Sequence, residues 1–283
     1  MIEAILGIII FLIAVFALVV VINHISFNSM VKSEIREMTE NVKKDHSKIK
    51  SEKTDSLPAQ LKNYLQNVTE TGAEDVNLAR LRQTGKFRTD QKQSWRDITA
   101  EQYIRTDEPA FIWRAKILLM PFLVLDARDK FNKNIANILI KVFSTFNLFN
   151  ETHEEVYQSS ILRYFSEMIW FPSAFIDNPY VTYKEKDEKT ITAEISFNGY
   201  KCSADLHFDD ENLITKITTD QRYMNRENEP WTAYYSNYRS TGKYKIPTHV
   251  EAEWHLSDIS FKYAVLDIIE ADYNIYKNYR DDK

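Results

Sequence analysis

The chain has 283 residues, of which 44% are hydrophobic and 13% aromatic, and its formal net charge is -5. This length and apolar content are enough for a domain with a substantial core. The negative charge argues against a nucleic-acid-binding protein, which would need a basic surface. Cys202 is the only cysteine, which excludes an internal disulfide framework and a cysteine-rich metal site.

The N-terminal segment is predicted to cross a membrane. Residues 4–22 form an uncharged apolar run, AILGIIIFLIAVFALVVVI. As a helix this run spans roughly 28 Å, close to the hydrocarbon core of a bilayer. It has neither a basic n-region nor a small-residue cleavage site, so it favours an uncleaved anchor over a signal peptide. We therefore expect a single-pass membrane protein in which residues 1–28 are the transmembrane anchor.

The charges beside the span say little about orientation. No basic residue precedes the span, whereas several follow it: Lys32, Arg36, Lys43 and Lys44. This bias slightly favours a cytoplasmic soluble domain under the positive-inside rule. Glu34 and Glu37 accompany the first two cations, which leaves the side open.

Residues 29–56 are predicted to form a charged stalk. The residues Val31, Ile35, Met38 and Val42 recur at helical spacing, so the stalk should begin as a helix and loosen into a solvated linker after Lys43. A basic patch that binds anionic lipid is the alternative. Residues 32–53 hold seven Lys and Arg against five Asp and Glu, which favours an ordinary solvated stalk.

Residues 57–283 are predicted to form one α+β domain. After a short helix that opens at Leu57 and Pro58, period-two alternation indicates about ten antiparallel strands. The clearest are 191–197 and 200–208, joined by a tight Asn198-Gly199 turn, and 250–256. Further candidates are 76–88, 110–120, 122–129, 135–143, 180–185, 213–220, 231–239 and 261–276. Since the strands do not alternate with helices, we expect a large, curved, half-barrel-like antiparallel sheet with helices packed on one face.

The stretch ILRYFSEMIWFPSAF (161–175) belongs to the clearest soluble helix, which should begin at Glu154 or Glu155 and end at Pro172. Its apolar stripe consists of Ile161, Leu162, Phe165, Met168 and Ile169. Arg163, Glu167 and Trp170 share another face. The stripe is predicted to pack on the sheet, which leaves the other face for a site.

A series of motifs runs through the soluble part of the chain. In order they are LPAQLKNYL, LRQTGKFR, SWRDITAEQY, EPAFIWRAKI, LDARDKF, ILRYFSEMIWFPSAF, QRY, PW and YRSTGKYKIPTHVEAEW. Over residues 57–276 the chain resembles an uncharacterised bacterial family of membrane-anchored proteins, a domain of unknown function. The most specific block is RYxxExxWFPxA, which starts at Arg163 and ends at Ala174. KFNKNIAN (130–137) departs from the glycine-rich turn of that family. The resemblance implies one unit behind a membrane anchor and carries no activity.

Catalytic and metal sites have weak support. The sequence contains no GxSxG, HExxH, P-loop or GxGxxG motif. His249, Glu251, Glu253 and His255 alternate on one strand, but they span roughly 20 Å, so a solvated face is favoured over a metal site. We predict no metal and no cofactor. Glu167 in an apolar pocket would have a raised pKa, yet an ion pair with Arg163 is favoured. Cys202 is expected to be a small buried side chain.

Aromatic residues crowd the C-terminal strands, which is typical either of cross-strand packing or of a lined concave face. The candidate ligand-binding residues are Arg163, Glu167, Trp170, Arg128, Trp113, Trp231 and Trp254. We favour a membrane-tethered, non-enzymatic domain that binds a lipid or another hydrophobic molecule. The alternatives are a structural or interaction protein of the cell envelope without a cavity and, with least support, a hydrolase. A cavity of several hundred Å³ would distinguish the first from the second.

Overall fold

A computed structural model describes residues 1–283 except 45–46, 50, 122, 225–226, 258 and 280–283. The helices are α1 (Ile2–Glu40), α2 (Ala59–Val68) and α3 (Glu154–Glu167), and the short 3₁₀ turns are η1 (Ser51–Thr54), η2 (Met168–Trp170) and η3 (Pro172–Phe175). The strands are β1 (Leu78–Phe87), β2 (Arg96–Arg105), β3 (Ala110–Met120), β4 (Leu123–Asn132), β5 (Ile135–Val142), β6 (Phe146–Glu151), β7 (Val181–Asp187), β8 (Thr190–Phe197), β9 (Tyr200–Phe208), β10 (Ile214–Met224), β11 (Glu227–Thr241), β12 (Tyr244–Leu256) and β13 (Ile259–Tyr273). Residue 122, the first of the predicted strand 122–129, lies outside the described residues.

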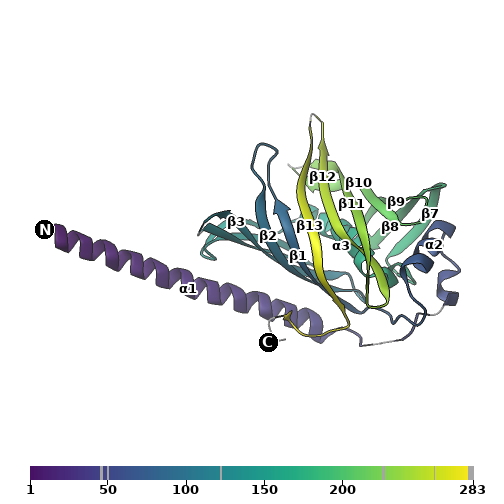
Figure 1. Ribbon diagram of the computed structural model, residues 1–283, viewed down its shortest axis with the longest axis horizontal. Helices are drawn as coiled ribbons and strands as arrows, with labels where there is room; N and C mark the ends of the chain where they lie inside the picture. The colour runs from purple at the N-terminus through teal and green to yellow at the C-terminus, as the bar shows by residue number, and fades with distance from the viewer. Residues whose placement is uncertain (45–46, 50, 122, 225–226, 258, 280–283) are drawn as a thin grey trace.

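All thirteen strands belong to one antiparallel sheet in the order β6-β5-β4-β3-β2-β1-β13-β12-β11-β10-β9-β8-β7. Figure 1 shows this sheet curving around α3. Within β1–β6 and within β7–β13, neighbours along the chain pair with each other. β13 returns to pair with β1, so β6 and β7 form the two edges of the sheet. The predicted α+β class with a large, curved antiparallel sheet is confirmed.

Two strands were missing from the prediction. In β2 the concave-facing positions include small Ala100 and polar Gln102, so the alternation of apolar and polar residues is weak, although Gln102 is fully buried. The edge strand β6 is exposed along nearly its whole length, so its sequence carries no alternation. The predicted hairpin between 191–197 and 200–208 is present. Asn198 and Gly199 take φ of 50° and 84°, the left-handed conformation that a tight hairpin turn requires.

Helix α3 lies against the concave face, where it contacts β5 on one side and β8, β9 and β10 on the other. Its apolar stripe is buried. The helix begins at Glu154, as predicted, and ends at Glu167; the 3₁₀ turn η2 continues it to Trp170, and a separate 3₁₀ turn, η3, begins at Pro172. The Tyr157 hydroxyl donates a hydrogen bond to the Lys133 carbonyl oxygen (3.1 Å) and accepts one from Asn198 Nδ2 (2.8 Å). Asn198 also donates to Asn134 Oδ1 (2.9 Å). The start of α3 therefore joins the β4–β5 turn to the β8–β9 turn and closes the half-barrel there.

Helix α1 has an exposed half and a packed half. Its N-terminal residues are exposed and apolar, and the helix is long and apolar enough to cross a membrane. Figure 1 shows this part, in purple, extending away from the sheet. The packed half lies on the face of the sheet opposite α3, because its cluster contains Ile112 of β3, whereas the neighbouring Phe111 and Trp113 belong to the core under α3.

The packed half of α1 differs from the solvated stalk expected at residues 29–43. Val31 is completely buried, and Ile35 and Met38 are nearly so. Glu34 of the same helix pairs with Arg128 (3.1 Å) and Lys130 (3.2 Å) of β4. The recurring apolar residues are therefore the buried face of a helix packed on a sheet. Glu34, one of the charges that suggested a solvated surface, forms ion pairs with the sheet. The division of the chain into anchor, stalk and soluble domain stays a prediction.

Candidate functional site

A cavity of about 310 Å³ lies between α3 and the concave face of the sheet. This volume is at the lower end of the range of ligand pockets, about 300–1,000 Å³. Most of the lining is aliphatic or aromatic and comes from β1–β5 and β10–β13. The polar residues of the lining are Asp129, Ser159, Arg163, Ser166, Glu167, Arg222, Tyr223, Tyr235 and Tyr263.

Of the seven residues proposed from the sequence, six line this cavity: Trp113, Arg163, Glu167, Trp170, Trp231 and Trp254. Trp170 lies in η2, where its indole N–H donates to the Pro247 carbonyl oxygen (3.2 Å). Arg128 does not line the cavity. Successive strand residues point to opposite faces, so Asp129 enters the cavity while Arg128 reaches Glu34 of α1 on the far face.

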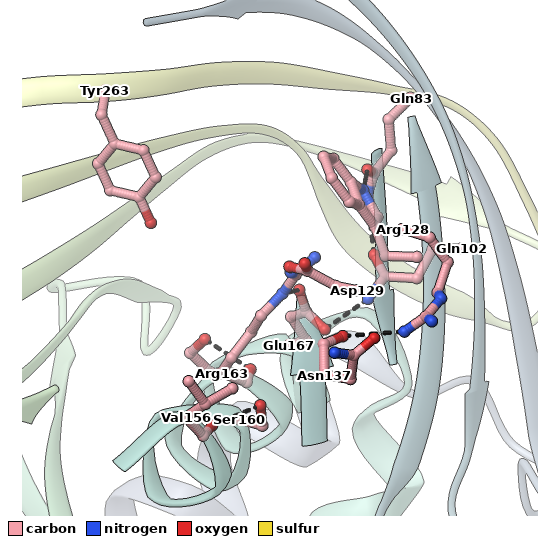
Figure 2. Close-up of polar contacts among 12 residues, drawn as sticks. Gln83, Gln102, Arg128, Asp129, Asn137, Val156, Ser160, Arg163, Glu167 and Tyr263 are labelled. Carbon is pink, nitrogen blue, oxygen red and sulfur yellow. Dashed lines mark hydrogen bonds and ion pairs between the residues drawn. The ribbon is translucent and has the colours of Figure 1, made fainter. Parts of the chain in front are cut away.

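Arg163 joins two acidic residues of the cavity. Its Nε donates to Glu167 Oε1 (2.8 Å), which is the predicted i, i+4 ion pair, and its Nη1 donates to Asp129 Oδ2. Figure 2 shows Arg163 rising from α3 toward Asp129 with Glu167 beside it. The guanidinium also lies 4.8 Å from the ring centroid of Phe111 and 5.1 Å from that of Trp113. Both carboxylates are therefore occupied by one cation that is itself held between rings.

A chain of hydrogen bonds supports Glu167 from the sheet. Gln102 Nε2 donates to Glu167 Oε2 (2.6 Å), Gln83 Nε2 donates to Gln102 Oε1 (3.1 Å), and Trp113 Nε1 donates to Gln83 Oε1 (2.8 Å). Gln102 is fully buried and Gln83 is 2% exposed. Sequence reasoning missed both glutamines, because an isolated Gln in a strand looks like a surface residue. The network fixes the orientation of the Glu167 carboxylate.

Burial and the neighbouring charges shift the pKa values of these groups. Burial raises the pKa of Glu167 above its ordinary value, and Arg163 and Gln102 offset part of that rise. Burial likewise raises the pKa of Asp129, against the opposing effect of Arg163. For Arg163, burial alone would lower the pKa, but Glu167 and Asp129 raise it. Since both carboxylates face the same guanidinium, the geometry favours a buried ion-pair network over a general acid–base pair.

Arg222 is a second cation of the cavity that the candidate set did not include. Its guanidinium lies 4.5 Å from the ring centroid of Trp231 and 5.4 Å from that of Trp254. Its Nη1 is 3.4 Å from the Tyr263 hydroxyl. Its Nε is buried and has no hydrogen-bond partner among the residues that the structure describes. The QRY motif (221–223) was the available signal.

Helix α3 fixes the segment of β10 that carries Arg222. The register of β10 against β11 shifts between Thr219 and Arg222, so the strand bulges there. On one side of Arg222, the Gln221 carbonyl oxygen accepts a hydrogen bond from Gln158 Nε2 (3.2 Å). On the other side, the Tyr223 amide donates to Ser159 Oγ (2.8 Å). The position of the guanidinium is therefore tied to α3.

The four His and Glu residues of β12 do not meet at one point, although His249 Nε2 lies 3.6 Å from Glu251 Oε1. His249 pairs with Asp267 (2.7 Å), and His255 hydrogen-bonds Thr232 (2.9 Å) and Ser260 (2.8 Å). Within the described part of the chain, no group of three or more His, Cys, Asp and Glu residues is arranged to hold a metal ion. Cys202 is buried, and burial raises the pKa of its thiol to about 12.

The solved structures that align with this chain share little sequence with it. A Vibrio parahaemolyticus domain provisionally assigned as an outer membrane lipoprotein-sorting protein has 9% identity and a TM-score of 0.44, over 72% of this chain and 88% of its own. A LolA superfamily protein from Nitrosomonas europaea has 10% identity and a TM-score of 0.41, over 74% and 89%. A DUF1329 family protein from Desulfovibrio piger has 9% identity and a TM-score of 0.33, over 72% and 88%.

A comparison with curated proteins finds no match. A family model, by contrast, matches residues 47–266, a range that includes α3 and every residue that lines the cavity. This match confirms the resemblance to a family of unknown function that the sequence motifs indicated. The chain belongs to DUF6544, a family of unknown function.

Proposed function

We propose that this chain is a membrane-tethered, non-enzymatic domain that binds a lipid or a similar amphipathic molecule in the cavity under α3. The observation that carries the proposal is the cavity itself: about 310 Å³, lined mainly by apolar side chains, with one guanidinium that no described carboxylate neutralises in an ion pair. The proposed tether is the apolar part of α1, residues 4–22. The proposal holds whether the soluble domain lies on one side of the membrane or the other.

The lining supports a hydrophobic ligand. Transfer of apolar surface out of water contributes roughly 25 cal/mol per Å², so an aliphatic chain gains affinity wherever it contacts such a wall. The apolar residues of the wall are Phe87, Ile98, Trp113, Ile117, Ala127, Ile138, Ile140, Val156, Trp170, Trp231, Ala233, Val250, Ala252, Trp254, Ala264 and Leu266. The small volume favours a ligand with one acyl chain over one with two.

The polar end of the ligand is assigned to Arg222. The hydrogen bonds of Arg163 go to Glu167 and Asp129, so Arg163 is already engaged. The buried Nε of Arg222 is a donor without an acceptor, which is costly unless a ligand supplies one. With two carboxylates and two guanidinium groups the cavity is formally neutral, so the acceptor can be a carboxylate, phosphate or ester oxygen.

The experiment is photo-crosslinking of the full-length chain in phosphatidylcholine nanodiscs with a diazirine-bearing fatty acid. The proposal predicts labelled peptides from β11, β12 and β13. Ala252→Phe adds bulk to the cavity wall and should abolish this labelling. Ser236→Phe adds bulk at an exposed position of β11 and should leave it unchanged. Labelling confined to residues 2–25 in every variant would contradict the proposal.

The alternative functions have less support. A structural or interaction protein with a solid interior does not account for the cavity. A hydrolase would draw on the raised pKa of Glu167, but that carboxylate already accepts hydrogen bonds from Arg163 and Gln102.

A further inference from the structure

Large apolar side chains are exposed beside α1, around the end of the sheet where the β3–β4 and β5–β6 hairpins turn and along the edge strand β6. Leu118 and Met120 lie at the end of β3, and Phe146, Leu148 and Phe149 lie on β6; all five are between 42% and 59% exposed. We name these five residues the apolar edge. The β3–β4 and β5–β6 hairpins that carry them are neighbours, because β4 pairs with β5. An exposed edge strand with this composition is a risk for aggregation unless something covers it.

The β5–β6 turn, Phe143 to Thr145, holds this edge against α1. The ring centroids of Phe143 and Phe16 are 6.1 Å apart in an edge-to-face arrangement. Asn23 Nδ2 donates to Thr145 Oγ1 (3.3 Å), and His24 Nδ1 lies 2.9 Å from Ser144 Oγ. Phe143 and Ser144 have φ of 51° and 53°, a conformation that non-glycine residues rarely adopt. The backbone conformation of this turn therefore fits it to α1.

The level of this contact along α1 places the apolar edge at the membrane. Phe16 lies six residues before Ile22, the end of the predicted span, which is about 9 Å along the helix axis. Phe143 therefore reaches a level inside the span. Lys116 precedes Leu118 by two residues, and Lys141 precedes Phe143 by two, so two cations lie on either side of Asp126 on the domain side of the apolar residues. Long cationic side chains at such a position can reach lipid head groups.

The cavity adjoins the same edge. Ile117 of the cavity wall is next to Leu118, and Ile138 and Ile140 lie on β5, which leads directly into the Phe143 turn. We propose that the apolar edge docks into the bilayer that α1 crosses, so that the cavity receives its ligand directly from the membrane. The docking rests on the membrane tether of the proposed function.

The test is lipid quenching of a site-specific fluorophore on the full-length chain. The background is Cys202→Ala, which removes the single cysteine of the sequence. The edge probes are Met120→Cys and Leu148→Cys, each labelled with nitrobenzoxadiazole. Leu12→Cys reports the span, and Lys189→Cys, in the distant β7–β8 turn, reports solvent. Each variant is reconstituted in phosphatidylcholine vesicles with and without doxyl-labelled phosphatidylcholine.

Docking predicts that the doxyl lipid quenches the two edge probes nearly as strongly as the Leu12 probe and leaves the Lys189 probe bright. Edge probes that behave like Lys189 while Leu12 is quenched would overturn docking and leave the tether standing. An unquenched Leu12 probe would overturn the tether and docking together. Edge probes with blue-shifted emission but no quenching would show that protein, such as a second copy of the chain, covers the edge, and would also overturn docking.

Discussion

Arg222 lies over the ring of Trp231 with 4.5 Å between the guanidinium carbon and the ring centroid, and its buried Nε has no hydrogen-bond partner among the described residues. The other cation of the cavity, Arg163, donates to both Glu167 and Asp129. Two arginines in one cavity therefore differ in what they offer: Arg163 organises the wall, and Arg222 retains a free donor. Substitution of Arg222 should therefore weaken ligand binding, and substitution of Arg163 should lower stability.

Removal of the free donor should weaken ligand binding. Arg222→Met retains the stem that packs on the tryptophans and loses the donors. Hydrogen bonds to charged groups contribute about 1.5–3 kcal/mol, so affinity for a fatty acid should fall about tenfold or more. The measurement is displacement of a fluorescent fatty acid from the full-length chain. Arg239→Met, an exposed position on β11, is the control and should bind as the native chain does.

The same displacement assay tests whether Arg222 acts through an oxygen acceptor of the ligand. A fatty acid and its methyl ester both offer an oxygen acceptor to Arg222, whereas the matching alkane offers none. Arg222→Met should therefore weaken binding of the acid and the ester and leave alkane binding unchanged. An equal loss for all three ligands would mean that Arg222 only shapes the cavity.

Loss of Arg163 should destabilise the fold. Arg163→Met leaves Glu167 and Asp129 buried without their cation, and breaking a buried ion pair in this way costs about 3–5 kcal/mol. The matched control is Arg36→Met, because Arg36 and Glu40 form an exposed i, i+4 pair at 3.4 Å, and such pairs contribute at most about 1 kcal/mol. Urea unfolding in detergent micelles measures both variants. Equal small losses would show that the cavity pair is not structural.

Loss of the Gln102 amide should disrupt the hydrogen-bond chain that runs from Trp113 through Gln83 and Gln102 to Glu167. Gln102→Leu leaves Gln83 Nε2 without its acceptor and Glu167 Oε2 without its donor, although Glu167 Oε1 keeps its hydrogen bond from Arg163. Unsatisfied buried polar groups cost about 1–3 kcal/mol each, so the free energy of unfolding should fall by at least that amount. Gln66→Leu on the exposed face of α2 is the control. Stability unchanged in Gln102→Leu would contradict the role assigned to the network.

The raised pKa of Glu167 predicts a pH dependence of stability. Because the folded state holds this proton more tightly than the unfolded chain, it binds more protons at pH values from about 4.5 up to the raised pKa. The contribution of Glu167 to stability is therefore present below about 4.5 and decreases as pH rises through that window. Glu167→Gln should flatten the decrease, and Glu185→Gln at an exposed position of β7 should not. The free energy of unfolding measured against pH tests this.

Much of the fold could be predicted because regular strands alternate. The Arg163–Glu167 pair followed from helical spacing, and the turn at Asn198-Gly199 followed from the turn chemistry of those two residues. Alternation in β4 also indicates that Arg128 and Asp129 point to opposite faces of the sheet, since Ala127, Asp129 and Phe131 share a face. The charged residues at 126 and 128–130 obscured this pattern. Arg222 follows a bulge, and at a bulge the alternation of residues no longer indicates which face of the sheet a side chain points to. The burial of Gln83 and Gln102 depends on partners far along the chain, which local sequence does not encode.

The most direct test of a ligand-binding cavity is native mass spectrometry of the full-length chain. The chain is released from phosphatidylcholine nanodiscs after incubation with a saturating concentration of a fatty acid. The proposed function predicts one bound fatty acid per chain, retained at collision energies that strip loosely attached lipid, and lost in Ala252→Phe but not in Ser236→Phe. A native chain that emerges without the fatty acid, or a fatty acid that is retained equally in both variants, would contradict a ligand-binding cavity.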